Sequence, residues 1–242
     1  MLIAQLSDIH AAPENDNLVR LHQAIDWLLT VKPDVLVVTG DLTDDGWREG
    51  YEAIADELQR LPCRALLLPG NADDKQVMCA SLAQFAQRAA DAPLHFYELF
   101  DGLPVIGVDV TVHGESRGDI LPHLAWLDTA LRAAPQPAMV FLHQHLFASG
   151  IAPLDSAMCD GGPELAQLLA RLPHPPLALS CGHVHRPASA MFAGIPAYIC
   201  GSVCLANPLM LDAQRVPPVT DPTGLMVHDI RAGKCVSHFV SV

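Results

Sequence analysis

Positive charge is scarce in this chain. Its 14 lysine and arginine residues are outnumbered by 27 aspartate and glutamate residues, so the formal net charge of the 242 residues is −13. A protein that binds the phosphates of a nucleic-acid polymer normally presents a basic face, and this deficit argues against such a partner. A small anionic substrate remains compatible with the acidity, because bound metal cations would dominate the local field of a site.

Long apolar runs and secretory features are lacking as well. The sequence has no apolar stretch of about 18 residues or more, so we expect no membrane-spanning helix. Its first ten residues have no basic leader and no small-residue cleavage site, so we expect no signal peptide. The seven cysteines show no C-x-x-C spacing, which is typical of buried thiols in a reducing compartment. We therefore expect a cytoplasmic protein.

Apolar residues make up half of the chain, which is ample for the core of one domain spanning residues 1–242. In the first part, strand-like runs at 2–6, 35–39 and 65–68 alternate with helical patterns at 18–31, 47–61 and 75–90. This βαβαβ order indicates a parallel sheet covered by helices.

The remainder has shorter and more antiparallel elements. Strands at 95–99 and 105–110 flank Asp101-Gly102, which is a typical hairpin turn. Further helices are predicted at 121–134 and 164–172, and further strands at 138–142, 177–180, 190–192, 197–200, 225–229 and 236–240. We expect a two-layered β core wrapped by helices. The proline-rich segment 203–223 has weak periodicity and is expected to form either a lid or a contact in a homodimer.

Polar motifs directly follow five of the predicted strands, at the position where open α/β sheets place their sites. These motifs are Asp8-x-His10, Gly40-Asp41, Gly70-Asn71-x-Asp73, His143 and Gly182-His183-x-His185. Residues two apart in an extended backbone point to the same face, so Asp8 and His10 are expected to bind one ion. A carboxylate at Asp41 can bridge two cations, and Asn71 offers an amide oxygen to the second.

This donor set predicts a site for two divalent cations. Nitrogen and oxygen ligands without cysteine favour Mn²⁺, Fe²⁺, Zn²⁺ or Co²⁺ over Mg²⁺ or Ca²⁺. Two such ions, about 3.5–4 Å apart with open positions, would share a bridging hydroxide nucleophile and bind phosphoryl oxygens.

Taken in order, the motifs Ser7-Asp8-Ile9-His10, Gly40-Asp41-Leu42-Thr43-Asp44, Gly70-Asn71-Ala72-Asp73 and Gly182-His183-Val184-His185-Arg186 resemble those of calcineurin-like metallophosphoesterases. They are most similar to class III cyclic-nucleotide phosphodiesterases and to the related bacterial glycerophosphodiesterases. The resemblance covers about residues 2–204 and implies a four-layered α/β/β/α sandwich. It also implies that Asp8, His10, Asp41 and His185 hold the first metal, and that Asp41, Asn71, His143 and His183 hold the second.

The chain departs from this family pattern at Ala72. The family usually has Gly-Asn-His-Asp, and its histidine contacts the phosphate and helps to protonate the leaving group. A missing general acid costs about 10²–10⁴-fold in rate, and least for leaving groups that need no proton. We take Asn71 and His143 as catalytic residues that position the phosphoryl group, and we keep His145 and His113 as candidates for the missing imidazole.

These features favour an enzyme, a dinuclear phosphodiesterase for small diesters such as a cyclic nucleotide, a glycerophosphodiester or a phosphonate monoester. A phosphomonoesterase is the close alternative, although a dianionic substrate usually requires more cationic groups than this sequence offers. A catalytically degenerate scaffold that binds metal and another protein is the second alternative. Only Ala72 favours it, because a pure scaffold has no physical need for seven metal ligands.

Overall fold

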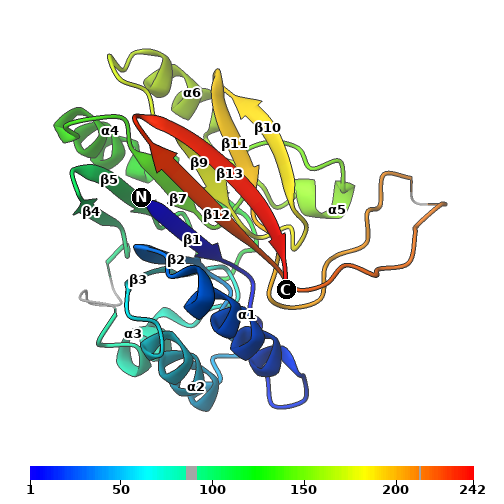
Figure 1. Cartoon of the computed structure of the whole chain (residues 1–242). Coiled ribbons are helices and arrows are strands. Elements are labelled where there is room, and N and C mark those ends of the chain that lie inside the picture. The colour runs from blue at the N-terminus through cyan, green and yellow to red at the C-terminus, as the bar shows by residue number, and fades with distance from the viewer. Residues whose placement is uncertain (86–91, 213) are drawn as a thin grey trace.

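Two mixed β-sheets form the centre of the molecule in the computed structural model, which describes residues 1–85, 92–212 and 214–242. The first sheet has the strand order β13-β12-β1-β2-β3 (Figure 1). Its strands are β1 (Leu2–Leu6), β2 (Val35–Thr39), β3 (Arg64–Leu68), β12 (Gly224–Arg231) and β13 (Lys234–Ser241). β1, β2 and β3 run parallel, and β12 pairs antiparallel with β1. The helices α1 (Asn17–Val31), α2 (Arg48–Gln59) and α3 (Lys75–Ser81) belong to this half of the chain.

The second sheet has the order β10-β11-β9-β7-β5-β4. Its strands are β4 (Phe96–Phe100), β5 (Leu103–Val108), β7 (Met139–Leu142), β9 (Ala178–Cys181), β10 (Ala188–Phe192) and β11 (Ile195–Ile199). The 3₁₀ helix η1 (Leu121–His123) leads into α4 (Leu124–Ala133), and α6 (Gly162–Ala170) lies beside α4. The short helix α5 (Ala152–Asp155) and the two-residue strands β6 (Gly118–Asp119) and β8 (Cys159–Asp160) complete the described elements.

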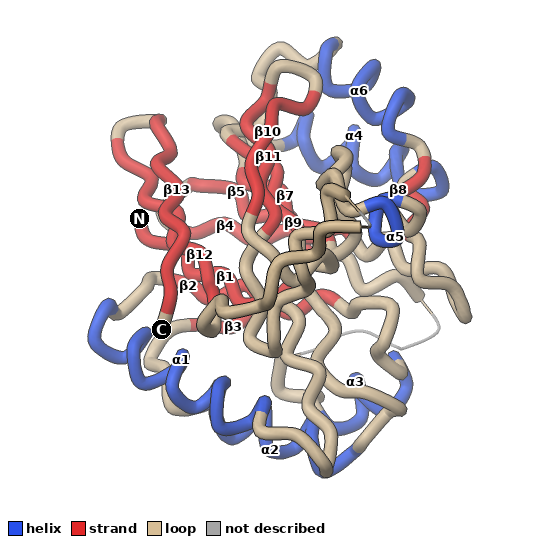
Figure 2. The backbone as a smooth tube through the Cα atoms, turned by 90° about the vertical axis from the view of Figure 1, so that its right-hand side faces the viewer, coloured by secondary structure: helices blue, strands red, loops and turns tan. Residues whose placement is uncertain are grey.

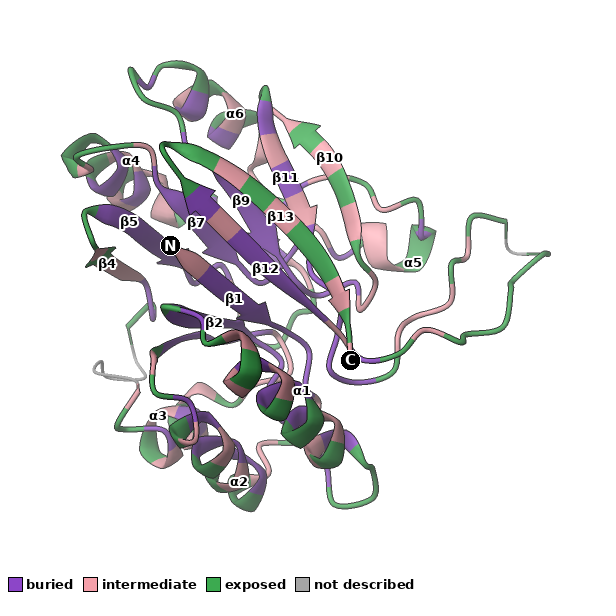
Figure 3. Ribbon diagram, in the orientation of Figure 1, coloured by how far each residue is buried: buried purple, intermediate pink, exposed green. Residues whose placement is uncertain are grey.

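Three separate clusters of buried apolar residues lie between four layers. One cluster joins the first sheet to α1 and α2, a second joins the other sheet to α4 and α6, and the third lies between the sheets. Strand β1 contributes to two of them, because Ala4 and Leu6 face the helices while Ile3 faces the other sheet. Figure 2 shows both sheets between the helical layers, and Figure 3 shows the central strands as buried. The predicted α/β/β/α sandwich is confirmed.

Most predicted elements have ends within two residues of those observed. The helix predicted at 75–90 is wrong in its length, because α3 ends at Ser81 and residues 82–85 form turns; residues 86–91 lie outside the described part. The hairpin turn is confirmed, since Asp101 and Gly102 both have positive φ (48° and 84°), as a type I′ turn requires.

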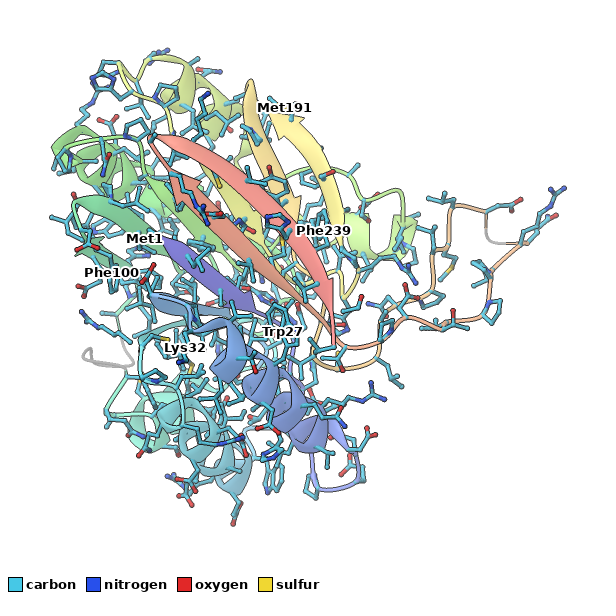
Figure 4. The ribbon with its side chains drawn as sticks, viewed as in Figure 1. Met1, Trp27, Lys32, Phe100, Met191 and Phe239 are labelled. Atoms are coloured by element: carbon cyan, nitrogen blue, oxygen red, sulfur yellow. The ribbon has the colours of Figure 1, made fainter. Side chains whose placement is uncertain are left out.

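The outermost strands of both sheets carry exposed apolar side chains. Met191 on β10 and Phe239 on β13 are 64% and 45% exposed on the outermost strands of their sheets (Figure 4).

The described residues of segment 203–223 form neither helix nor strand, and Figure 1 shows this segment extending away from the sheets. Among the described helices, none has the length and hydropathy needed to cross a membrane.

Candidate metal centre

The predicted ligands meet where the carboxyl ends of parallel strands from both sheets come together. Asp8 and His10 follow β1, Asp41 follows β2, Asn71 follows β3, His143 follows β7, and His183 and His185 follow β9. Backbone hydrogen bonds connect these loops: Asp8 N donates to Gly40 O at 3.0 Å, and Gly182 N donates to His143 O at 2.9 Å. The loops that carry the ligands therefore support each other directly.

Left-handed backbone conformations place most of these side chains. Five ligand residues have positive φ, namely Asp8 (55°), His10 (48°), Asp41 (52°), His183 (71°) and His185 (56°). The extended backbone expected for Asp8 and His10 is therefore wrong, since β1 ends at Leu6. Non-glycine residues in such conformations cost of order 1–3 kcal/mol each and persist only where the surroundings enforce them, most often at functional sites.

Two glycines allow the β2 and β3 loops to approach closely. A Cβ atom at Gly40, whose φ is +93°, would lie 2.4 Å from Gly70 N. A Cβ atom at Gly70 would lie 2.1 Å from Asp41 Oδ1. Any side chain at either position would therefore separate Asp41 from Asn71.

The first group of donors consists of Asp8, His10, Asp41 and His185, whose ligand atoms all lie within 4.8 Å of one another. His10 Nε2 lies 3.2 Å from Asp41 Oδ2 and 3.0 Å from His185 Nε2, and His185 Nε2 lies 3.4 Å from Asp8 Oδ1. Asp8 and Asp41 are almost completely buried. Buried carboxylates facing imidazole nitrogens are the donors that a divalent transition metal takes.

The second group consists of Asp41, His143 and His183, with Asn71 beside it. His143 Nδ1 lies 2.6 Å from Thr39 O, which can only accept a hydrogen bond, so Nδ1 carries a hydrogen and the lone pair of a deprotonated Nε2 would point into the group. This Nε2 lies 3.3 Å from Asp41 Oδ2 and 3.3 Å from His183 Nδ1.

The Asn71 side chain completes the second group. Its amide oxygen lies 3.2 Å from His143 Nε2 and accepts a hydrogen bond from Gln144 Nε2 at 3.4 Å. A buried carboxylate, two imidazoles and an amide oxygen are nitrogen and oxygen donors of the kind that a divalent transition metal takes. The residues present therefore fit a divalent cation in this group.

Most of the imidazoles are also held through their second nitrogen. Asp44 Oδ1 lies 2.6 Å from His10 Nδ1, and Cys204 Sγ lies 3.2 Å from His185 Nδ1. Partners of this kind fix the tautomer and ring orientation of metal-binding histidines. Sequence reasoning missed both roles; the position of Asp44 at the end of the motif Gly40-Asp41-Leu42-Thr43-Asp44 was a signal, whereas Cys204 had none.

Asp73 connects the loops that follow β2 and β3. Its Oδ1 accepts hydrogen bonds from Leu42 N at 3.0 Å and Tyr51 Oη at 2.9 Å, and its Oδ2 accepts one from Gly70 N at 2.8 Å. Burial and the nearby charge of Asp41 raise the pKa of Asp73 to about 6. Asp73 therefore holds the β2 and β3 loops together without being one of the clustered donors.

The charges of the centre suit a cation. Burial disfavours the charged form of every group, but nearby imidazoles still lower the pKa of Asp8 and, more strongly, that of Asp41. Burial likewise opposes protonation of His10 and His143, yet the hydrogen bond and charge of Asp41 raise their pKa values to about 10 and about 9. His183 remains neutral, because burial and the charge of His143 lower its pKa to about 3. In the absence of metal, protons occupy the position that a cation would take.

The two candidate proton donors lie in different surroundings. His113 is exposed and lines a cleft of about 660 Å³ together with Asn71, Ala72 and Lys75. His145 is fully buried, and its ring stacks on that of His183 with centroids 5.5 Å apart. His145 Nε2 lies 3.4 Å from Asp155 Oδ1, and within the described ranges its Nδ1 has no hydrogen-bond partner. Only His113 faces the cleft beside Ala72.

The chain is similar in sequence to known phosphoesterases. The sequence model of the calcineurin-like phosphoesterases matches residues 1–187. The chain is 28% identical to a probable glycerophosphodiester phosphodiesterase, GpdQ of Arcobacter nitrofigilis, over 94% of the chain and 88% of that protein. It is 27% identical to the 3′,5′-cyclic adenosine monophosphate phosphodiesterase CpdA of Escherichia coli, over 84% of the chain and 76% of that protein.

A solved structure shows the same fold. The crystal structure of a dimetal phosphatase from Danio rerio superposes with a TM-score of 0.75, covering 100% of the chain and 97% of the phosphatase at 13% identity.

Proposed function

The chain belongs to the calcineurin-like phosphoesterase family and is a metal-dependent phosphodiesterase, and we propose that it uses two metal ions to hydrolyse small phosphodiesters. The observation that carries this proposal is the convergence of two donor groups on one shared carboxylate, Asp41. We assign the first ion to Asp8, His10, Asp41 and His185, and the second to Asp41, Asn71, His143 and His183. When bound, such ions supply a hydroxide nucleophile and neutralise charge on the phosphoryl oxygens. The ligand types suit Mn²⁺, Fe²⁺, Zn²⁺ or Co²⁺.

The residues of the chain itself position the reaction. Asn71 lines the cleft and His143 is buried directly beside it, and together they orient the phosphoryl group. Ala72 provides no proton, so substrates with good leaving groups react with the least loss. For alkoxide leaving groups, His113 is the donor best placed at the cleft, whereas His145 is buried beside His183 and would need a rearrangement to reach a substrate.

The charge of the cleft favours a diester over a monoester. Among the residues that the structure describes, Lys75 is the single Lys or Arg that lines it, and its Nζ already lies 2.6 Å from the buried carboxylate of Asp109. Asp45 and Asp74 also line the cleft. A monoanionic diester therefore suits it better than a dianionic monoester. Cyclic nucleotides, glycerophosphodiesters and phosphonate monoesters are the candidate substrates, and the cytoplasm is the proposed location.

Segment 203–223 remains a candidate lid or dimer contact, and Arg186 connects it to the centre. Arg186 Nη1 and Nη2 donate to the Asp221 carboxylate at 3.0 and 2.6 Å, and its Nε donates to Asn207 O at 2.9 Å. Because Arg186 directly follows His185, the base of the segment is attached to the ligand loop. A movement of segment 203–223 would therefore displace the loop that carries His185, a proposed ligand of the first metal.

One assay tests the proposed function. The protein is stripped with a chelator and restored with Mn²⁺, and hydrolysis of bis(p-nitrophenyl) phosphate is compared with that of p-nitrophenyl phosphate, with Asp41→Asn as the blank. We expect metal-dependent turnover that favours the diester and is lost in the variant. Preference for the monoester would reject the substrate class, and metal binding without any turnover would support the scaffold alternative.

A further inference from the structure

We propose that Cys204, together with His10 and His185, forms a site for one thiophilic divalent cation such as Cd²⁺, and that an ion bound there displaces the ion of the first metal position. The displacement rests on the proposed function, because it requires that a metal occupies that position. The Cys204 site itself rests only on the side chains described below.

The three side chains already converge. Cys204 Sγ, one nitrogen of His10 and one nitrogen of His185 all lie within 4.8 Å of one another. Cys204 Sγ lies 3.2 Å from His185 Nδ1. The other nitrogen of this ring, Nε2, faces Asp8 Oδ1 at 3.4 Å. Cys204 therefore lies at the side of the His185 ring that the carboxylates do not use.

Cys204 is held firmly in this position. Its N–H donates to Asp8 O at 3.0 Å, and its carbonyl accepts a hydrogen bond from Ser202 Oγ at 2.9 Å. The residue is only 7% exposed. Among the residues that the structure describes, no other cysteine belongs to a group of three metal-binding side chains. The backbone of Cys204 is thus fixed directly beside Asp8, one of the first group of donors.

Because both the first metal position and the Cys204 site need His10, the two cannot be occupied at the same time. The Nδ1 of His10 is taken by Asp44 Oδ1 at 2.6 Å, so only Nε2 can bind a metal. That Nε2 lies 3.2 Å from Asp41 Oδ2 and belongs to the first group of donors. An ion bound by His10 Nε2, the His185 ring and the Cys204 sulfur takes two of the four side chains of the first position.

The chemistry of the sulfur ligand determines which ions bind at the Cys204 site. A thiolate is a soft ligand and selects ions such as Cd²⁺ and Zn²⁺, whereas Mn²⁺ prefers oxygen ligands such as carboxylates, carbonyl groups and water. On binding, the S–H bond of Cys204 breaks, its proton passes to solvent, and the sulfur electron pair forms the bond to the cation. No oxidant or other reactant is needed.

The test titrates cadmium chloride into protein that has been loaded with Mn²⁺ and freed of excess metal. Two quantities are followed: the ultraviolet thiolate-to-cadmium charge-transfer band and the Mn²⁺ released from the protein. We expect the band to saturate at one Cd²⁺ per chain as one Mn²⁺ is released. The band should be absent in Cys204→Ser and retained in the control Cys79→Ser, whose thiol is partly exposed elsewhere.

A band that persists in Cys204→Ser, or that disappears in Cys79→Ser, would overturn the site, and a band that grows without release of Mn²⁺ would overturn the displacement. X-ray absorption at the cadmium edge of the unmodified protein gives a check without any variant: one sulfur ligand supports the site, and ligation by nitrogen and oxygen alone rejects it. If the protein retains no Mn²⁺ at the start, the proposed function fails, while the band and its loss in Cys204→Ser still decide the cysteine site.

Discussion

Replacing Ala72 by histidine restores the residue that the family motif usually has there, and tests whether that histidine protonates the leaving group. Ala72 lines the cleft, and its backbone N–H donates to Asp41 Oδ1 at 2.8 Å. The substitution keeps this backbone bond and directs an imidazole into a space of about 660 Å³, so little strain is expected. The variant thereby adds a proton donor beside the phosphoryl position without altering a ligand.

The size of the effect depends on the leaving group. General acid catalysis contributes about 10²–10⁴-fold, equivalent to about 2.7–5.4 kcal/mol of the activation free energy. An alkoxide, as released from 3′,5′-cyclic AMP, needs the proton and should show most of this gain. A p-nitrophenolate leaves without protonation, so bis(p-nitrophenyl) phosphate should change only a few-fold, on the order of 1 kcal/mol or less.

The assay measures kcat/KM for both substrates with Mn²⁺-loaded protein. Ala72→Asn serves as the matched control, because it adds a polar side chain that cannot transfer a proton at neutral pH. The reasoning is refuted if the histidine variant accelerates both substrates equally, or if the asparagine variant accelerates cyclic AMP hydrolysis as much as the histidine variant does.

Three further results are expected. Asp44→Asn should weaken Mn²⁺ binding about 10–100-fold because His10 loses its anionic partner; calorimetry should show no such loss for exposed Asp45→Asn, and an equal loss in both would reject the role of Asp44. Mn²⁺ at about 100 times its Kd should stabilise the folded protein by about 2.7 kcal/mol and raise Tm by roughly 5–10 °C, reversed by chelator; an unchanged Tm would contradict a metal centre. Burial lowers the pKa of His228 to about 3, so this ring is neutral when folded and protonated when unfolded below about pH 6.5. Stability should therefore fall by about 2 kcal/mol between pH 6.5 and 5, and urea unfolding of His228→Asn should lack this part of the slope; an identical slope would refute it.

Much of the fold could be predicted because its central strands are buried on both faces. In β2, for example, Val35 and Val37 face the other sheet while Leu36 and Val38 face the helices, so the sequence there is a continuous apolar run. Helix α3 was predicted too long because an apolar helical pattern continues past Ser81, where the observed helix ends. Periodicity shows which face of a segment is apolar, but it does not fix where the helix stops.

The candidate site could be predicted in its composition but not in its conformation. The motifs identified the residues that now lie together, since each directly follows a strand that ends at the same edge. The left-handed backbone of Asp8 and His10 could not be predicted, because positive φ is uncommon in residues other than glycine and, although aspartate and histidine are enriched among the exceptions, tertiary contacts decide which of them adopt it. The partnership of Cys204 with His185 joins positions 19 residues apart and depends on the packing of two loops.

The most direct test of the two-metal centre is anomalous diffraction at the manganese edge from crystals grown or soaked with Mn²⁺. We predict two anomalous peaks per chain that share Asp41 as a ligand, one also bound by Asp8, His10 and His185, and the other by Asn71, His143 and His183. A single peak, or two peaks that do not share Asp41, would contradict the account.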